Sequence, residues 1–308
     1  MPVWNAARAV KIARSMPSLC NPVSAVLPLS STPCWVVTTV SVAAALNPRA
    51  RQLINAADVA PELGYIMQKY LAYLTLGLSY ILGGGSMIAF AVFLYAGHLD
   101  LVNLGLDEPQ ALLLNAGLSL AFFIQHSTMV RRSFQKFLFK FSQKAYSGAI
   151  YSIASGIFLF LVVIFWQGTS NLFEAEGLTR VILRVMFILP VTGFVWGVKA
   201  LGLFDPFGIK GILDYQRNTK SRPVVFTVRG PYQWVRHPLY LFILVMIWSC
   251  PNLTTDRLLF NILWSVWIFV GTILEERDLV EQFGDAYREY QKKVPMLFPC
   301  KFIKKESP

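Results

Sequence analysis

Six stretches of the chain carry few or no charged residues. They are 70–97, 110–130, 145–173, 181–204, 238–255 and 258–274. A helix needs roughly 20 apolar residues to cross the hydrocarbon of a bilayer, and most of these stretches reach that length. The apolar part of the fifth stretch ends at Pro251, so it predicts a tight hairpin with the sixth, with a first arm short for a full span. The pattern predicts an all-α, polytopic membrane protein with about six transmembrane helices, including a C-terminal helical hairpin.

The composition supports a membrane protein. The chain is 55% hydrophobic and only 15% charged, with a mean hydropathy of +0.50, whereas soluble domains usually carry about 25% charged residues. Its four cysteines, Cys20, Cys34, Cys250 and Cys300, show no paired spacing. The sequence therefore predicts no metal site and no disulfide framework.

The basic residues are distributed unevenly among the loops. The chain has a net charge of +11, with five bases in 131–144, six in 205–237 and seven after residue 274, against none in 99–109. Cytoplasmic loops of membrane proteins carry such an excess of Lys and Arg. We therefore expect the lipid bilayer, and no nucleic acid, as the partner of this charge. Both termini, and the segments 236–237 and 275–276, should lie on the cytoplasm-like side.

The first 57 residues have a different composition from the rest. They contain five bases and no Asp or Glu, which resembles an organelle transit peptide or, alternatively, a bacterial N-terminal tail. We expect an N-terminal extension over 1–65, a transmembrane domain over 66–300 and a C-terminal tail over 301–308. The membrane would be a bacterial inner membrane or an organelle membrane. Within the domain, Gly83–Gly85, Gly148 and Gly156 predict close helix packing, because membrane helices associate through small residues.

Two charged clusters bracket the predicted hairpin and are the strongest candidates for chemistry. Pro238 suits the first turn of a helix, which places His237 beside free backbone N–H groups and Arg236, an environment that attracts a carboxylate or phosphate. Glu275 and Glu276 return to the same level and can accept hydrogen bonds from an ammonium group or hydroxyls. Each cluster alone is more often an ordinary charged helix end. Together they predict a site for a zwitterionic ligand.

A third polar group, Gln125-His126-Ser127, lies near the inner end of the second predicted helix. A histidine in a membrane span is more often a packed, hydrogen-bonded residue than a ligand. Because His237 is expected at the same depth, ligation of a haem by His126 and His237 remains an alternative.

The combined motif resembles the membrane methyltransferases, which include isoprenylcysteine carboxyl methyltransferase and the phospholipid N-methyltransferases. It consists of Arg-His-Pro-Leu-Tyr at 236–240, Glu-Glu-Arg-Asp-Leu at 275–279, Phe-Gly-x-x-Tyr-x-x-Tyr at 283–290 and Val-Pro at 294–295. Gln125-His126-Ser127, the loop Phe204–Gly208 and Val294–Leu297 are closer to the methanethiol S-methyltransferase and NnrU/nurim-like branch. The resemblance covers about residues 70–300.

The resemblance implies S-adenosylmethionine as the cofactor. The residues that would bind it are Arg236, His237, Tyr240, Glu275 and Glu276, with Tyr287 and Tyr290 closing the pocket. One departure is Leu241-Phe242 after Tyr240, where relatives commonly have a Gly nearby.

The resemblance also implies methyl transfer to a small thiol, most simply methanethiol, which would give dimethyl sulfide. Alternatives are an isoprenylcysteine or phospholipid methyltransferase, a haem-dependent isomerase similar to zeta-carotene isomerase, and a non-enzymatic nurim-like protein. The isomerase would need further histidines near 275–295, and the chain has only three in total. No catalytic base is identified, although His126 is a candidate.

The loop charges give a testable topology. A reporter fused after Pro308 should face the cytoplasm-like side, and one inserted at Asn103 should face the opposite side, because basic loops are retained inside. Accessibility of the two reporters in intact cells measures this. Both reporters on the same side would contradict the six-helix arrangement.

Overall fold

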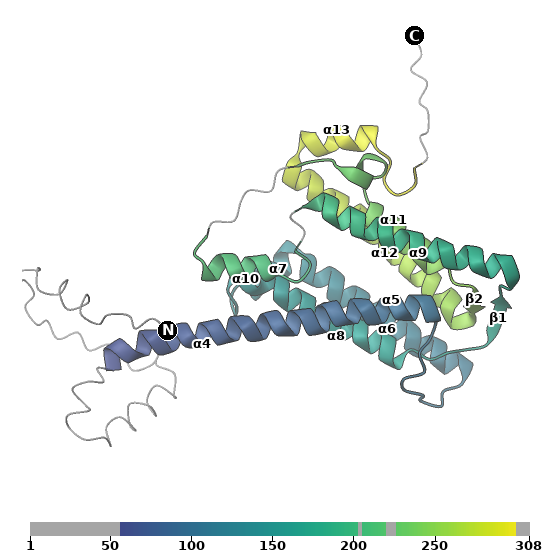
Figure 1. Cartoon of the computed structure of the whole chain (residues 1–308), viewed down its shortest axis with the longest axis horizontal. Helices are drawn as coiled ribbons and strands as arrows, with labels where there is room; N and C mark the ends of the chain where they lie inside the picture. The colour runs from purple at the N-terminus through teal and green to yellow at the C-terminus, as the bar shows by residue number, and fades with distance from the viewer. Residues whose placement is uncertain (1–55, 203–204, 220–225, 300–308) are drawn as a thin grey trace, which may run out of the picture. The chain divides into compact units, whose positions relative to one another are not determined.

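The computed structural model describes residues 56–202, 205–219 and 226–299 (Figure 1). The chain divides into two compact units, Met1–Ile66 and Met67–Pro308, and only the second is described over most of its length. Most of the expected extension 1–65, Phe204 of the loop motif and the tail 301–308 lie outside the described residues.

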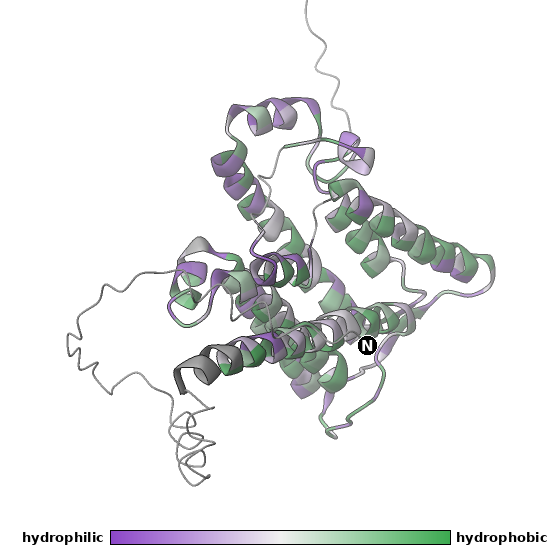
Figure 2. Ribbon diagram, turned by 60° about the vertical axis from the view of Figure 1, so that its left-hand side comes forward, coloured by the Kyte–Doolittle hydropathy of each residue, from purple (hydrophilic) through white to green (hydrophobic). Residues whose placement is uncertain are grey.

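Five described helical spans are long and apolar enough to cross a membrane. The first, Leu63–Ala96, runs through α4 (Ala56–Leu78), a π-helical turn η1 (Ser79–Gly84) and α5 (Gly85–Ala96). The others contain α6 (Glu108–Val130), η2 with α8 (Lys144–Tyr146 and Ser147–Phe165), α9 (Gly177–Leu201) and α12 (Thr255–Phe283). Figure 2 shows the apolar colouring along these helices and polar colouring at α13 (Asp285–Lys293). The prediction of a helical, polytopic membrane protein is confirmed.

The remaining predicted stretch forms α11 (Pro238–Trp248). Its 11 residues extend over about 17 Å, well short of the ~30 Å of hydrocarbon. Ser249, Cys250 and Pro251 end the helix before the chain turns into α12. The hairpin is therefore asymmetric, as its sequence predicted, with a short first arm and a long return.

A small two-stranded sheet is the one departure from an all-helical description of these residues. β1 (Asn171–Glu174) pairs antiparallel with β2 (Asn252–Thr254). The third apolar stretch extends to residue 173, but α8 ends at Phe165. Beyond it, the backbone of Gln167 exchanges hydrogen bonds with the Asn115 side chain, N to Oδ1 at 2.9 Å and Nδ2 to O at 2.8 Å. These buried contacts turn the chain out of the helix.

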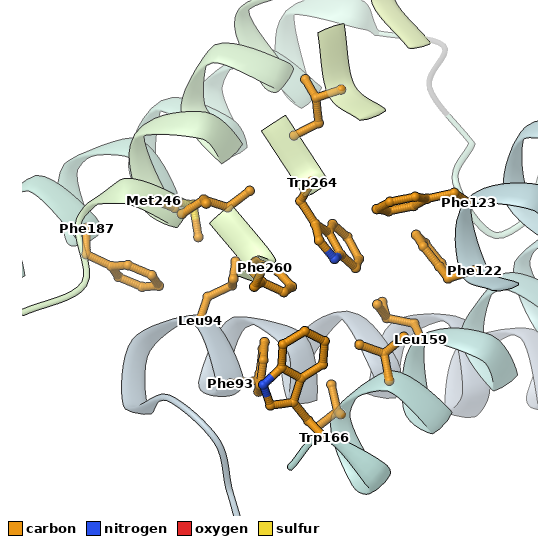
Figure 3. Packing of buried hydrophobic residues seen from close by; sticks show 14 residues of the cluster. Phe93, Leu94, Phe122, Phe123, Leu159, Trp166, Phe187, Met246, Phe260 and Trp264 are labelled. Atoms are coloured by element: carbon orange, nitrogen blue, oxygen red, sulfur yellow. The ribbon is translucent and has the colours of Figure 1, made fainter. Parts of the chain in front are cut away.

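Aromatic side chains fill the core between α5, α6, α8 and α12 (Figure 3). Phe260 stacks on Trp264 with ring centroids 4.8 Å apart, and Phe93 meets Trp166 edge-on at 5.5 Å. Aromatic pairs in these geometries each add about 0.5–1.5 kcal/mol beyond the area they bury. The core thus fixes the start of α12 against α5 and α8, which in turn determines where its other end lies.

Glycines allow α8 to approach η1 closely, as the sequence predicted. A Cβ on Gly156 would lie 2.3 Å from the Leu82 carbonyl oxygen, and one on Gly83 would lie 2.1 Å from the Ser152 Oγ. Gly156 therefore has to be glycine, because the backbone it faces cannot move away, whereas at Gly83 the Ser152 hydroxyl would have to change its position.

Short helices lie in the connections between α6 and α8 and between α9 and α11. They are α7 (Arg132–Leu138), α10 (Ile209–Gln216) and the 3₁₀ turn η3 (Gly230–Gln233). Asp205 caps α10 by accepting hydrogen bonds from Ile209 N at 2.9 Å and Lys210 N at 2.7 Å. The Phe207 carbonyl accepts a bond from Ser79 Oγ at 2.7 Å. The described part of the 204–208 motif therefore holds α10 against η1 and α8.

Candidate functional site

The chain enters α11 through a backbone contact with its own C-terminal segment. Arg236 N donates to Pro295 O at 2.9 Å, and His237 N donates to Met296 O at 3.1 Å. Pro238 then occupies the first turn of α11, where its missing N–H leaves no donor unsatisfied. The motifs at 236–240 and 294–297 are therefore hydrogen-bonded to each other through their backbones.

A bidentate ion pair joins the start of α11 to the inner end of α12. Arg236 Nε donates to Glu276 Oε1 at 2.5 Å, and Nη2 donates to Oε2 at 2.9 Å. Arg236 Nη1 also donates to the carbonyls of Gln291 and Val294, at 3.0 and 2.5 Å. Both charged side chains are only about one-tenth exposed. The guanidinium group thus closes the hairpin and fastens α13 to it.

The Glu276 carboxylate has little capacity left for a ligand. Besides Arg236, Oε1 lies 3.1 Å from His237 Nε2 and accepts from the Tyr287 hydroxyl at 3.3 Å. Oε2 accepts from Gln291 Nε2 at 2.7 Å. A carboxylate offers about four acceptor positions, so these neighbours saturate it.

Glu275 has different surroundings although it is adjacent in sequence. Its side chain is 44% exposed, and its Oε2 accepts from the Tyr240 hydroxyl at 2.7 Å. His237 Nδ1 lies 3.8 Å from the same oxygen. The Tyr240 ring stacks on His237 with centroids 5.7 Å apart and planes inclined by 12°. Glu275 is therefore the carboxylate of the pair with acceptor capacity to spare.

Tyr287 and Tyr290 lie beside this cluster, against Phe226. The two tyrosine rings are 5.7 Å apart, and Phe226 meets them at 5.7 and 5.5 Å. Burial, and then the Glu276 charge, raise the pKa of Tyr287 well above its ordinary value. Burial likewise raises the pKa of Tyr290, whose hydroxyl donates to the Tyr232 carbonyl. Both hydroxyls therefore remain protonated donors at any physiological pH.

The structure brings all seven predicted cofactor residues into one cluster, and His126 lies apart from them. Among the described residues, the His126 ring contacts the Tyr151 hydroxyl, at 2.8 Å from Nε2, and the rings of Phe122 and Trp267. Tyr151 in turn lies within electrostatic range of Glu275 and Tyr240. His126 thus contacts Tyr151 directly, and Tyr151 interacts with the cluster electrostatically, without a hydrogen bond among the described contacts.

Sequence reasoning missed several members of the site. Gln291 and Tyr151 were not singled out, because a glutamine in a polar helix and a tyrosine in a span have many ordinary roles. Phe226 has no local signal either. The departure at 241–242 has a structural explanation at Phe242, whose ring packs against Gly193 of α9, where a Cβ would approach it to 2.7 Å. That side chain therefore contributes to the contact between α11 and α9.

Several proteins of known description are similar in sequence to most of this chain. It is 36% identical over 199 residues to methanethiol S-methyltransferase of Pseudomonas deceptionensis, covering 63% of this chain and 75% of that protein. It is 31% identical over 252 residues to methanethiol S-methyltransferase 1 of Bradyrhizobium diazoefficiens, covering 79% and 87%. Nurim of Rattus norvegicus is more distant, at 24% over 172 residues, covering 53% and 65%.

No family model matches the chain, and no solved structure matches it. The relatives nevertheless share more than 30% identity over at least three-quarters of their own length. The methyltransferase resemblance of the motifs is thereby confirmed, and the chain belongs to the methanethiol S-methyltransferase family.

Proposed function

We propose that the protein transfers a methyl group from S-adenosylmethionine to methanethiol and releases dimethyl sulfide. Two observations support this: its family membership and the half-exposed Glu275 carboxylate, which lies beside a saturated Arg236–Glu276 pair.

The residues of the cluster fit S-adenosylmethionine. Glu275 can accept from its ammonium group or a ribose hydroxyl. No described side chain caps the first turn of α11, so its N-terminus can attract the carboxylate. The Tyr240 ring, which His237 holds in place by stacking on it, suits a cation such as the sulfonium. Arg236 and Glu276 hold these groups in place, and Tyr287 and Tyr290 cover the cytoplasm-like side.

The protein's own task is alignment and proton removal. When bound, the cofactor supplies an activated methyl group, so the site needs only to orient the acceptor in line and exclude water. The nucleophile is the thiolate, and a free thiol is mostly protonated at neutral pH. We propose that the thiol proton passes to His126 through the Tyr151 hydroxyl, to which His126 is hydrogen-bonded, as the thiol sulfur takes the methyl group.

The distribution of basic residues indicates where the site lies in the membrane. The cluster lies at the ends of α11 and α12 that are continuous with the basic segments 205–237 and 275–305. We infer that it lies at the cytoplasm-like edge of the bilayer, where a small apolar thiol partitions without dedicated polar recognition.

The acceptor can be tested directly in membranes containing the protein. With S-adenosylmethionine and methanethiol we expect dimethyl sulfide in the headspace, measured by gas chromatography, and little transfer to a farnesylated cysteine or a phospholipid offered in parallel. His126→Gln should lower the rate at neutral pH and have a smaller effect at alkaline pH, where the thiol ionises in solution. Methylation of another acceptor without dimethyl sulfide would overturn the thiol assignment.

The two glutamates should respond differently to loss of charge. Glu275→Gln should weaken S-adenosylmethionine binding by roughly 1.5–3 kcal/mol, the scale of a hydrogen bond to a charged group, and leave the thermal midpoint unchanged. Glu276→Gln should lower the free energy of unfolding by about 3–5 kcal/mol, because it leaves the buried Arg236 unpaired.

Calorimetric titration and thermal unfolding in detergent measure the two effects. Glu289→Gln is the matched control, since it removes an exposed carboxylate of α13 that pairs with Lys292. If Glu275→Gln bound the cofactor as tightly as this control, Glu275 would not be a cofactor residue.

A further inference from the structure

A second polar cluster lies at the opposite end of α12 from the proposed active site. Arg257, near the start of the helix, and Glu276, near its end, are separated by roughly 28 Å at 1.5 Å per residue, close to the hydrocarbon thickness of a bilayer. Figure 1 shows β1 and β2 at this end of α12, and α13 at the other. The cluster therefore lies at the other edge of the membrane.

This cluster surrounds a cavity of about 250 Å³. It forms where the end of α5, the start of α12, β2 and α9 meet. Its polar lining includes His98, Arg184, Cys250, Asp256 and Arg257. Two of the three basic side chains are permanently charged arginines, which is unusual on the face whose loops carry few bases.

Arg257 is buried with an unused donor. It is 3% exposed, its Nη1 and Nη2 donate to the carbonyls of Phe93 at 3.3 Å and Leu94 at 2.7 Å, and its Nε has no hydrogen-bond partner among the described residues. A buried donor of a charged group is costly to leave unpaired. These contacts cap the end of α5, and the Cys250 side chain is close enough to interact with the guanidinium group, but Nε stays unpaired among the described residues.

The nearest carboxylate is already engaged. Asp256 Oδ2 accepts from Trp166 Nε1 at 2.8 Å, and Oδ1 accepts from Thr169 N at 3.1 Å and Thr169 Oγ1 at 3.0 Å. Asp256 is close enough to offset part of the Arg257 charge. No ion pair joins the two side chains among the described contacts. Arg257 thus lines the cavity without a bonded counter-ion.

Arg184 brings a second guanidinium group to the same cavity. It lies 4.0 Å above the Tyr95 ring and donates to the Tyr95 carbonyl. No described ion pair joins it to a carboxylate, and it is close enough to Arg257 for the two charges to repel. Two guanidinium groups that converge on one cavity are well suited to a phosphate, whose oxygens match their planar forks.

We propose that this cavity binds the phosphate group of a phospholipid from the leaflet opposite the active site. The adjoining surface of α9 favours a lipid over free phosphate as the source. Val185, Ile188 and Leu189 are exposed and follow Arg184 along the helix, and the exposed Val181 lies one turn before it. A lipid whose phosphate lies between Arg184 and Arg257 can place its acyl chains along this surface.

Cys250 offers a direct probe, because it is the free cysteine of the described residues and lines the cavity. With Cys20, Cys34 and Cys300 replaced by Ser, the rate of its alkylation by a maleimide reports occupancy. We expect phosphatidic acid in detergent micelles to slow the reaction at least tenfold, and diacylglycerol with the same chains to have no effect. Inorganic phosphate should act only at far higher concentration.

Two matched variants identify the residues responsible. Arg184→Gln should abolish the protection by phosphatidic acid. Lys199→Gln, near the other end of the same helix and outside both the cavity lining and the adjoining apolar surface, should retain it. Protection that persists in Arg184→Gln, or that diacylglycerol provides equally, would overturn the site. Equal protection by inorganic phosphate would leave an anion site and overturn its assignment to a lipid.

Discussion

The Arg236–Glu276 ion pair is the interaction on which the proposed active site depends. Two charges are removed from water together, and loss of either partner would leave the other buried at a cost of several kcal/mol. Their remaining hydrogen bonds reach Tyr287, Gln291 and Val294, so one pair of charges fixes α11, α12 and the C-terminal segment together. The same contacts explain the different roles of the two adjacent glutamates. Successive helical residues point about 100° apart, so Glu276 is held by its hydrogen bonds while the Glu275 side chain stays half-exposed.

The long helix α12 carries polar groups at both ends and an aromatic core between them. Phe260 and Trp264 pack against α5, α6 and α8, which positions the helix rigidly and transmits that position to Glu275. At the other end, Arg257 and Asp256 bind the carbonyls of α5 and the residues after α8. The distance between the two clusters matches the hydrocarbon thickness. The helix therefore connects the proposed active site at one of its ends to the proposed lipid site at the other.

The apolar stretches and the paired charged motifs were predictable from the sequence because each depends on local composition and spacing. These signals predict the positions of the helices and the short first arm of the hairpin. They also predict the grouping of Arg236, His237, Tyr240, Glu275 and Glu276. The β1–β2 pair does not, because its strands are seven residues in all and lie within or beside apolar runs. The division between Glu275 and Glu276 could not be predicted either, since it depends on Gln291 and Tyr287 folding back from α13. The cofactor, the acceptor and the membrane face remain predictions.

A double-mutant cycle between Arg236 and Glu276 tests the central claim most directly. The free energy of unfolding would be measured in detergent for Arg236→Gln, Glu276→Gln and the double variant. If the pair closes the hairpin, each single variant should lose about 3–5 kcal/mol, and the double variant should lose little more than either, because no buried charge is then left unpaired. Losses that simply add would contradict the account, since they would show that the two side chains contribute to stability independently.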